Sequence, residues 1–171
     1  MARKTAQVET RMVSEYLLKE YPQYTTLRAV PLGKVDNELM KSAGYQRALG
    51  FSRPYRPEVD AIAILPGAMV LIEAKVWNVV NGLAKLPLYK SLIPFTPELA
   101  EYKKLPVIME IVVGWSNANL EIMARDLDVR IKVFSPAWLT EIVNNMHQYW
   151  TADYRNKRAQ KLAQREIFGL E

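Results

Sequence analysis

Residues 56–77, RPEVDAIAILPGAMVLIEAKVW, constrain the fold of this chain more than any other stretch. Two apolar runs separated by a Pro-Gly pair predict two adjacent β-strands joined as a hairpin. Their apolar character predicts burial on both faces of a sheet, so the hairpin needs a layer on each side. The same runs carry Asp60, Glu73 and Lys75, three ionisable side chains at positions where Val or Ile would pack better. The charges therefore need an explanation other than packing.

The rest of the chain supplies the layers that the hairpin requires. Apolar residues at helical spacing predict an amphipathic helix from Gln7 to about Tyr21, and residues 24–33 predict a strand. After the hairpin we expect a helix over 80–94 with Pro87 at its first turn or at a kink, a strand over 105–115, a helix over 117–127, a strand over 129–135 and a helix over 136–150. This order predicts an α/β fold with a central mixed β-sheet flanked by helices.

Length and composition indicate one globular domain. The chain has 171 residues, of which 50% are hydrophobic and 24% charged, and we find no linker or repeat that would divide it. We therefore expect a single domain over residues 1–171, with a core over about 7–115, an extension over about 116–171, and a basic helix over 151–168. The longest apolar window is too short to cross a bilayer and the N-terminus does not resemble a secretory signal, so we expect no membrane span and a cytoplasmic location.

Several kinds of active site are excluded by composition. The chain has no cysteine, which excludes disulfides, thiolate metal sites and cysteine nucleophiles. His147 is the single histidine, so neither a histidine metal cluster nor a Ser/His/Asp triad can be assembled, and we interpret it as an ordinary helix residue. No phosphate-binding Gly-rich motif is present. Carboxylates and lysines remain as the groups that could carry chemistry.

A basic region precedes the hairpin. Residues 34–57 are predicted to form a loop, and there is no acid between Lys41 and Pro57. Aromatic residues alternate there with arginines, a mixture suited to phosphate contact and base stacking. A net charge of +5 adds a mild preference for polyanions. We predict nucleic-acid contacts from Arg47, Arg53 and Arg56; the alternative is a solvated loop whose aromatic side chains cover the core.

The charged residues of the hairpin suit metal-dependent hydrolysis. Glu73 and Lys75 lie two residues apart, so a strand places both on one face, about 6.6 Å apart along the chain. Asp60 begins the neighbouring strand. Two carboxylates on adjacent strands suit Mg²⁺ or Mn²⁺, and an ammonium beside them can orient water or stabilise charge on a phosphodiester. Glu9 falls on the apolar side of the first helix, either in a frayed first turn that favours the helix dipole or as an inward-facing acid.

The arrangement Pro57-x-x-Asp60, twelve intervening residues and then Glu73-Ala74-Lys75 resembles the signature of the PD-(D/E)xK nuclease superfamily. That superfamily includes restriction endonucleases, Holliday junction resolvases and many phage and repair nucleases. Its core order of helix, three strands, helix and strand is similar to the order predicted for residues 7–115, about two thirds of the chain. The resemblance implies a restriction-endonuclease-like core with C-terminal α/β additions, in an intracellular protein of a kind that phages also encode.

The resemblance also implies roles for individual residues. Asp60, Glu73, the carbonyl of Ala74 and Glu9, which matches a glutamate of the junction-resolvase branch, would hold Mg²⁺ or Mn²⁺. Lys75 would position the attacking water.

A looser match on the following helix places Lys85 and Tyr89 near the substrate. Two departures from the family pattern, the two residues between Pro57 and Asp60 and Pro87 inside the helical motif, concern substrate contact rather than the metal residues.

We therefore predict a metal-dependent endonuclease acting on branched or duplex DNA, with RNA also compatible and with a homodimer or larger assembly open. Three alternatives remain. The fold could serve as a non-catalytic DNA-binding or virion assembly component; its charges could form a buried ion-pair group without activity; or the basic C-terminal helix could dock on a partner protein.

Overall fold

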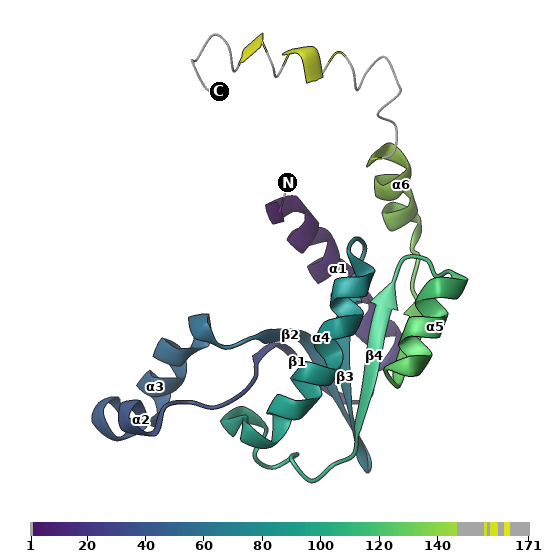
Figure 1. Cartoon of the computed structure of the whole chain (residues 1–171). Helices are drawn as coiled ribbons and strands as arrows, with labels where there is room; N and C mark the ends of the chain where they lie inside the picture. The colour runs from purple at the N-terminus through teal and green to yellow at the C-terminus, as the bar shows by residue number, and fades with distance from the viewer. Residues whose placement is uncertain (1, 147–155, 157, 161–162, 165–171) are drawn as a thin grey trace. The chain divides into compact units, whose positions relative to one another are not determined.

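The computed structural model describes residues 2–146, 156, 158–160 and 163–164 (Figure 1). The chain divides into two units, Met1–Ser135 and Pro136–Glu171. The second unit contains α6 (Ala137–Met146), which begins directly after Pro136 as the sequence predicts. His147 and most of the predicted basic helix over 151–168 lie outside the described residues. No helix in the described part of the chain is long and apolar enough to cross a membrane.

The first unit is built on a mixed five-stranded sheet. Its strands are β1 (Thr25–Pro31), β2 (Glu58–Leu65), β3 (Ala68–Lys75), β4 (Val107–Val113) and β5 (Val129–Val133), and their spatial order is the same as their order in the chain. The pairs β1–β2 and β2–β3 are antiparallel, whereas β3–β4 and β4–β5 are parallel. The predicted hairpin and the predicted mixed sheet are thus confirmed.

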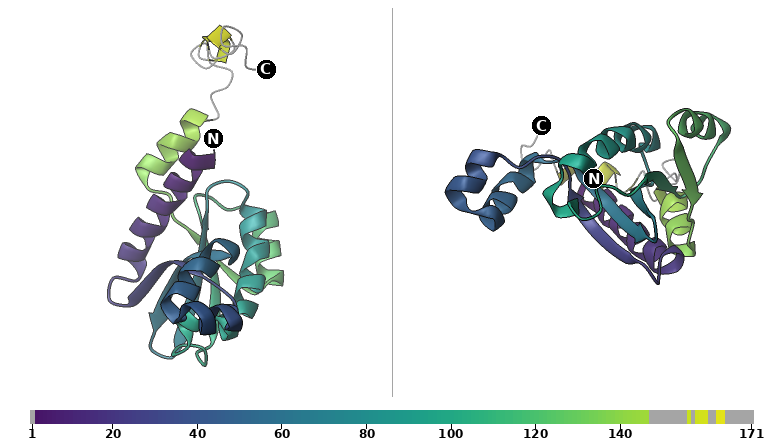
Figure 2. Two further views of the ribbon diagram at one scale, coloured as in Figure 1. Left: turned by 90° about the vertical axis from the view of Figure 1, so that its left-hand side faces the viewer. Right: turned by 90° about the horizontal axis from the view of Figure 1, so that it is seen from below.

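Helices cover both faces of the sheet, which confirms the α/β fold class (Figure 2). Helix α1 (Ala2–Glu20) packs on one face, against β2 and β3, while α4 (Val79–Leu92) packs on β3 and β4 from the other. Helix α5 (Ala118–Asp126) contacts β5 and α4. Because α1 begins at Ala2, Glu9 lies in the middle of the helix, and the interpretation that placed it in a frayed first turn is wrong.

Pro87 lies inside α4. Of our two expectations for this residue, the position in the first turn is therefore wrong. Leu83, Leu86 and Tyr89 around it are buried against the sheet. Burial of this face stabilises the helix despite the missing backbone donor, because tertiary packing contributes more to helix stability than local propensity does. The main core consequently lies between α4 and the sheet, where these side chains meet Leu71 and Ile111.

The opposite face contains a buried carboxylate. Glu110 of β4 is almost fully buried and accepts hydrogen bonds at one oxygen from the hydroxyls of Tyr16 (2.7 Å) and Tyr21 (3.0 Å). Burial and the neighbouring carboxylate raise the pKa of Tyr16 far above its usual range, so this tyrosine stays a donor. Two donors on one acceptor satisfy a buried group that would otherwise be costly, and they join the C-terminal end of α1 and the residue after it to β4.

The region before the hairpin is helical, so the predicted basic loop over 34–57 is wrong. It contains α2 (Asn37–Ala43), α3 (Tyr45–Ser52) and the 3₁₀ turn η1 (Arg53–Tyr55). The Asp36 side chain caps α2 by accepting from the backbone N–H groups of Glu38 and Leu39, a local signal that the basic composition obscured. We call residues 37–52 the arm, because α2 and α3 pack on each other and project from the sheet (Figures 1 and 2).

Buried polar contacts fix the base of the arm. The guanidinium of Arg56 donates to both carboxylate oxygens of Glu98, at 2.7 Å each, and to the carbonyls of Pro31 (2.8 Å) and Leu32 (3.4 Å). Glu98 belongs to the 3₁₀ turn η3 (Pro97–Leu99), which follows η2 (Ile93–Phe95). The chain leaving β1 and the chain entering β2 are thereby held to the segment that follows α4.

Candidate functional site

The three charges of the hairpin meet where β3 ends. Glu73 and Lys75 are the acidic and the basic residue of β3 and lie at its end. Asp60 lies near the start of β2. Ala61 pairs with Ile72, so Asp60 and Glu73 are the next residues along the two antiparallel strands. Glu9 reaches the same point from α1. The structure therefore brings together the three carboxylates that were predicted to hold the metal and the lysine that was predicted to position the water.

Backbone donors hold two of the carboxylates in place. Asp60 Oδ2 accepts a hydrogen bond of 2.9 Å from the N–H of Ala74, and Glu9 Oε1 accepts one of 3.2 Å from the N–H of Val76. Both donors lie on the stretch that contains Lys75, so the carboxylates are fixed relative to the end of β3. These contacts need a side-chain acceptor oxygen at each position, which the two carboxylates supply.

The ammonium of Lys75 lies in the middle of this group. Its Nζ is 3.1 Å from Glu73 Oε1, 3.4 Å from Glu9 Oε2 and 3.8 Å from Asp60 Oδ2. It also donates to the carbonyl of Ala74 at 3.0 Å. Only 15% of the Lys75 side chain is exposed, so the ammonium has exchanged most of its hydration for these four oxygens.

The electrostatics of Glu73 and Lys75 follow from this packing. Burial, followed by the charge of Asp60, raises the pKa of Glu73 to about 7 even though Lys75 acts in the opposite direction. For Lys75, burial lowers the pKa, but the charges of Glu73, Asp60 and Glu9 outweigh it, so the net pKa is raised. Lys75 thus stays protonated, whereas the charged form of Glu73 is disfavoured by its burial and by Asp60.

One oxygen of Glu73 is left without a partner. Glu73 Oε2 is buried and accepts no hydrogen bond from any residue that the structure describes, although the side chain is only 3% exposed. A buried carboxylate oxygen without a donor is costly. An oxygen of this kind is suited to a cation.

The donors fit a hard divalent cation, but the present arrangement does not. Three carboxylates and one carbonyl are the ligand types that Mg²⁺ and Mn²⁺ take. As the side chains stand, no group of three or more His, Cys, Asp or Glu residues within the described ranges is gathered closely enough to hold a metal ion. The ammonium of Lys75 lies among the carboxylates that a metal would share.

Two residues that the sequence analysis missed shape this site. A Cβ at Gly82 of α4 would lie 2.6 Å from Cγ of Lys75, closer than real contacts allow, so glycine is needed where the helix passes the lysine. Ala29 has a φ of 50°, in the left-handed region, and the pairs Arg28–Ala61 and Val30–Val59 place it opposite Asp60. Such strain often accompanies functional sites. A glycine inside an apolar helix was a usable signal for the first residue; nothing in the sequence marked the second.

The two substrate residues predicted on α4 differ in their surroundings. Lys85 is half-buried, and its charge lowers the pKa of Glu73, which places it within electrostatic range of the cluster. Tyr89 is buried; burial, then Glu73 and Asp60, raise its pKa to about 12. Lys85 can still face a ligand, whereas Tyr89 presents little surface to a nucleic acid.

The three predicted arginines separate in the same way. Arg47 is exposed on α3. Arg53 is 54% exposed and donates to Glu58 and to the carbonyl of Ala29, each at 2.9 Å. Arg56 is buried with a side chain only 4% exposed, and its donors are engaged at the base of the arm. A nucleic-acid contact from Arg56 is therefore wrong, because the guanidinium does not face solvent.

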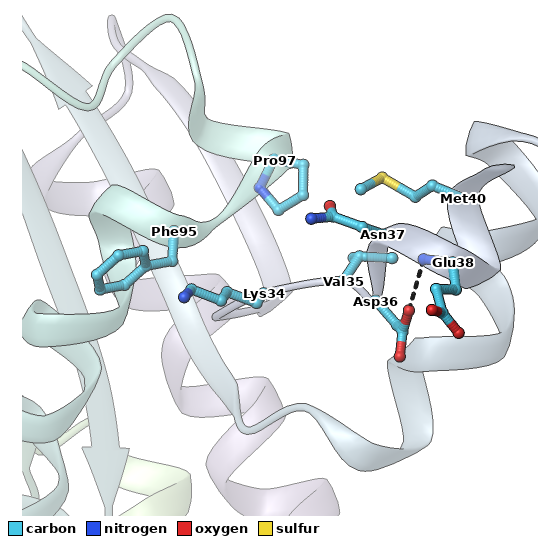
Figure 3. A pocket seen from close by; sticks show the side chains of 8 residues that line it. All are labelled: Lys34, Val35, Asp36, Asn37, Glu38, Met40, Phe95 and Pro97. Carbon is cyan, nitrogen blue, oxygen red and sulfur yellow. Dashed lines mark hydrogen bonds between the residues drawn. The ribbon is translucent and has the colours of Figure 1, made fainter.

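A pocket that does not include Glu9, Asp60 or Glu73 lies between the start of the arm and the segment that follows α4 (Figure 3). It has a volume of about 650 Å³ and is lined by Lys34, Val35, Asp36, Asn37, Glu38, Met40, Phe95 and Pro97. The Lys34 ammonium lies 4.9 Å from the centroid of the Phe95 ring. None of the site residues predicted from the sequence lines it, and its two carboxylates offset its single ammonium.

Comparison with known proteins adds little. No protein-family model matches the sequence, and no curated protein matches it. Among solved structures, a protein of unknown function, AF1548, is similar with 12% sequence identity and a TM-score of 0.45, and the likeness covers 75% of this chain and 60% of that one. A likeness of this size says nothing about activity, so any function has to be argued from the site itself.

Proposed function

We propose that the protein is a metal-dependent endonuclease that hydrolyses phosphodiester bonds in DNA. The observation that carries the proposal is the partly buried group formed by Glu9, Asp60, Glu73 and Lys75 around the end of β3. Gathering four charges there costs desolvation energy that the ion pairs repay only in part. A chain under selection for stability alone would be expected to place apolar residues at these positions.

Each residue has a role that its surroundings support. The carboxylates of Asp60, Glu73 and Glu9 and the carbonyl of Ala74 would hold the cation. A bound Mg²⁺ or Mn²⁺ would lower the pKa of a water molecule and neutralise charge on the phosphate. Lys75, whose pKa is raised, would donate hydrogen bonds that orient this water and stabilise the developing negative charge. Lys85 would contact the phosphate from α4.

The arm is the proposed nucleic-acid surface. Lys41 and Arg47 are exposed on it, together with Tyr45 and Phe51, and Tyr55, just after the arm, is 89% exposed. Exposed cations bind phosphates and exposed rings stack on bases. The second candidate, a DNA-binding or virion assembly component without activity, is favoured by one observation, the salt bridges of Lys75 with all three carboxylates, which an inert ion-pair group would also show.

Metal-dependent cleavage separates these two functions. We expect the full chain to cut supercoiled plasmid or synthetic branched DNA with Mg²⁺ or Mn²⁺, to stop cutting in EDTA, and to bind without cutting in Ca²⁺. The measurement is gel separation of nicked and linear products over time. Product formation that persists in EDTA, or none with either metal on both substrates, would reject the endonuclease.

Binding by the arm can be measured separately from cleavage. We expect Lys41→Ala combined with Arg47→Ala to weaken duplex binding in Ca²⁺ and to flatten the log–log dependence of affinity on salt by about two, because each lost phosphate contact removes about one unit. The matched control is Lys103→Ala combined with Lys104→Ala, which removes two exposed lysines ahead of β4. If the control pair flattens the slope and the arm pair does not, DNA binds elsewhere.

A further inference from the structure

The ammonium of Lys75 contacts the same four oxygen-bearing groups that the proposed function assigns to the metal. These groups are the carboxylates of Glu73, Glu9 and Asp60 and the carbonyl of Ala74, at 3.0–3.8 Å from Nζ. A cation bound by these oxygens would need the space and the charge complement that the ammonium now takes. A cation held by these oxygens would lie close to the ammonium, and two neighbouring positive charges repel strongly in a partly buried site.

Helix α4 determines where this ammonium lies. Gly82 faces the stem of Lys75, and an added Cβ would meet its Cγ at 2.6 Å and its Cδ at 3.5 Å. The third neighbour, Ile111 Cδ1, would be 3.2 Å away and would have to move by a few tenths of an ångström. The Lys75 stem is thus confined between α4 and the sheet, and its ammonium is directed to the carboxylates, because the helix carries no side chain at position 82.

We propose that Lys75 is an internal counter-ion that holds the carboxylate group together without metal and competes with a divalent cation for it, and that Gly82 is the positioning residue for this lysine. The inference rests on the proposed function for the identity of the competing cation. The proposed stabilisation of the carboxylates by Lys75 does not, because these ion pairs are made between side chains alone. It explains why a set of ligands suited to Mg²⁺ is not gathered for metal in the present arrangement.

The variant Lys75→Met keeps the apolar stem and removes the charge. For this variant, the stabilising role of Lys75 and its competition with metal predict opposite changes. Without metal, three carboxylates lose their shared partner, so the urea midpoint in EDTA falls. With metal, the competing charge is gone, so Mn²⁺ binds about tenfold tighter or more. Gly82→Ala, which crowds the lysine stem, changes both quantities in the same directions to a smaller extent.

Matched controls isolate the contact from general charge and helix effects. Lys85→Met removes a lysine of α4 that acts on Glu73 only through its charge, and we expect it to change Mn²⁺ affinity by about threefold at most. Gly50→Ala adds a methyl group in α3 where an added Cβ meets nothing within 4 Å, so it reports the gain in helix propensity alone.

The experiment uses the full chain with Mn²⁺ as the probe, calorimetric titration for affinity, and urea unfolding in EDTA for stability. Tighter binding by Lys75→Met than by Lys85→Met supports the competition, and equal affinities overturn it. Gly82→Ala that matches Gly50→Ala in both measurements overturns the positioning role, even if Lys75→Met cannot be purified. If neither the wild type nor any variant binds Mn²⁺, the metal site and the competition are both rejected. A lower urea midpoint for Lys75→Met would still support the role of Lys75 as a counter-ion, and an unchanged midpoint would overturn it.

Discussion

Replacing Glu73 by glutamine is expected to lower the rate of metal-dependent DNA cleavage by roughly 10²–10³-fold or more. The substitution keeps the shape of the side chain but removes its charge and one acceptor oxygen. Glu73 supplies the most buried carboxylate of the group and its only oxygen that is buried without a partner in the described structure. Loss of this charge should therefore weaken both the hold on a cation and the stabilisation of charge on the phosphate.

The variant is informative because it should remain folded. Glutamine can still accept a hydrogen bond from Lys75, and Glu9 and Asp60 remain to pair with the ammonium. The matched control is Glu101→Gln, an exposed acid before the amino end of β4, whereas the site lies at the carboxyl end of β3. We would measure first-order rates of plasmid nicking with Mg²⁺ and the circular dichroism of each protein. Equal rates for wild type and Glu73→Gln would assign the cutting to a contaminant.

The elements that the sequence predicted well are those whose pattern reflects burial. The hairpin of β2 and β3 was recognised from its apolar runs and central turn, and the charges within it were recognised because they contradict that pattern. Glu9 was noticed by the same reasoning, since an acid on the apolar side of a helix is conspicuous, but its assignment to the metal site came from the family resemblance. In each case the signal lies in residues close in sequence, whose spacing fixes the face on which they lie.

The features that were missed depend on contacts between distant residues. Gly82 matters because of Lys75 on another element, and the partner of Arg56 is Glu98, which lies beyond β3 and α4. No periodicity links such pairs. Residues 34–57 were predicted to be a loop because of their glycines, prolines and basic residues, whereas the helix α2 within them is capped by the side chain of Asp36. Charge density thus did not show that Arg56 is buried whereas Arg47 and Arg53 are exposed.

Arg56→Ala is expected to destabilise the protein by about 3 kcal/mol, the low end of the cost of removing one partner of a buried ion pair, because the Glu98 side chain that remains is 26% exposed. The change leaves Glu98 without its bidentate partner and the carbonyls of Pro31 and Leu32 without a donor. Arg53→Ala, three residues away, is the matched control. Its guanidinium is largely exposed and pairs with Glu58 at the surface, so we expect a loss of about 1 kcal/mol or less.

The pH dependence of this difference tests its cause. For Glu98, burial raises the pKa, but the hydrogen bonds and charge of Arg56 outweigh it, so the pKa lies below its ordinary value of 4.5. A carboxyl with a lowered pKa contributes stability that is complete above its unfolded pKa and is lost as the pH falls through its folded pKa. The difference in unfolding free energy between wild type and Arg56→Ala should therefore be constant above about pH 5 and narrow below about pH 4.5. Urea unfolding at several pH values measures it; a difference equal to that of Arg53→Ala, or one that does not narrow in acid, would show that the Arg56–Glu98 pair is not what fixes the base of the arm.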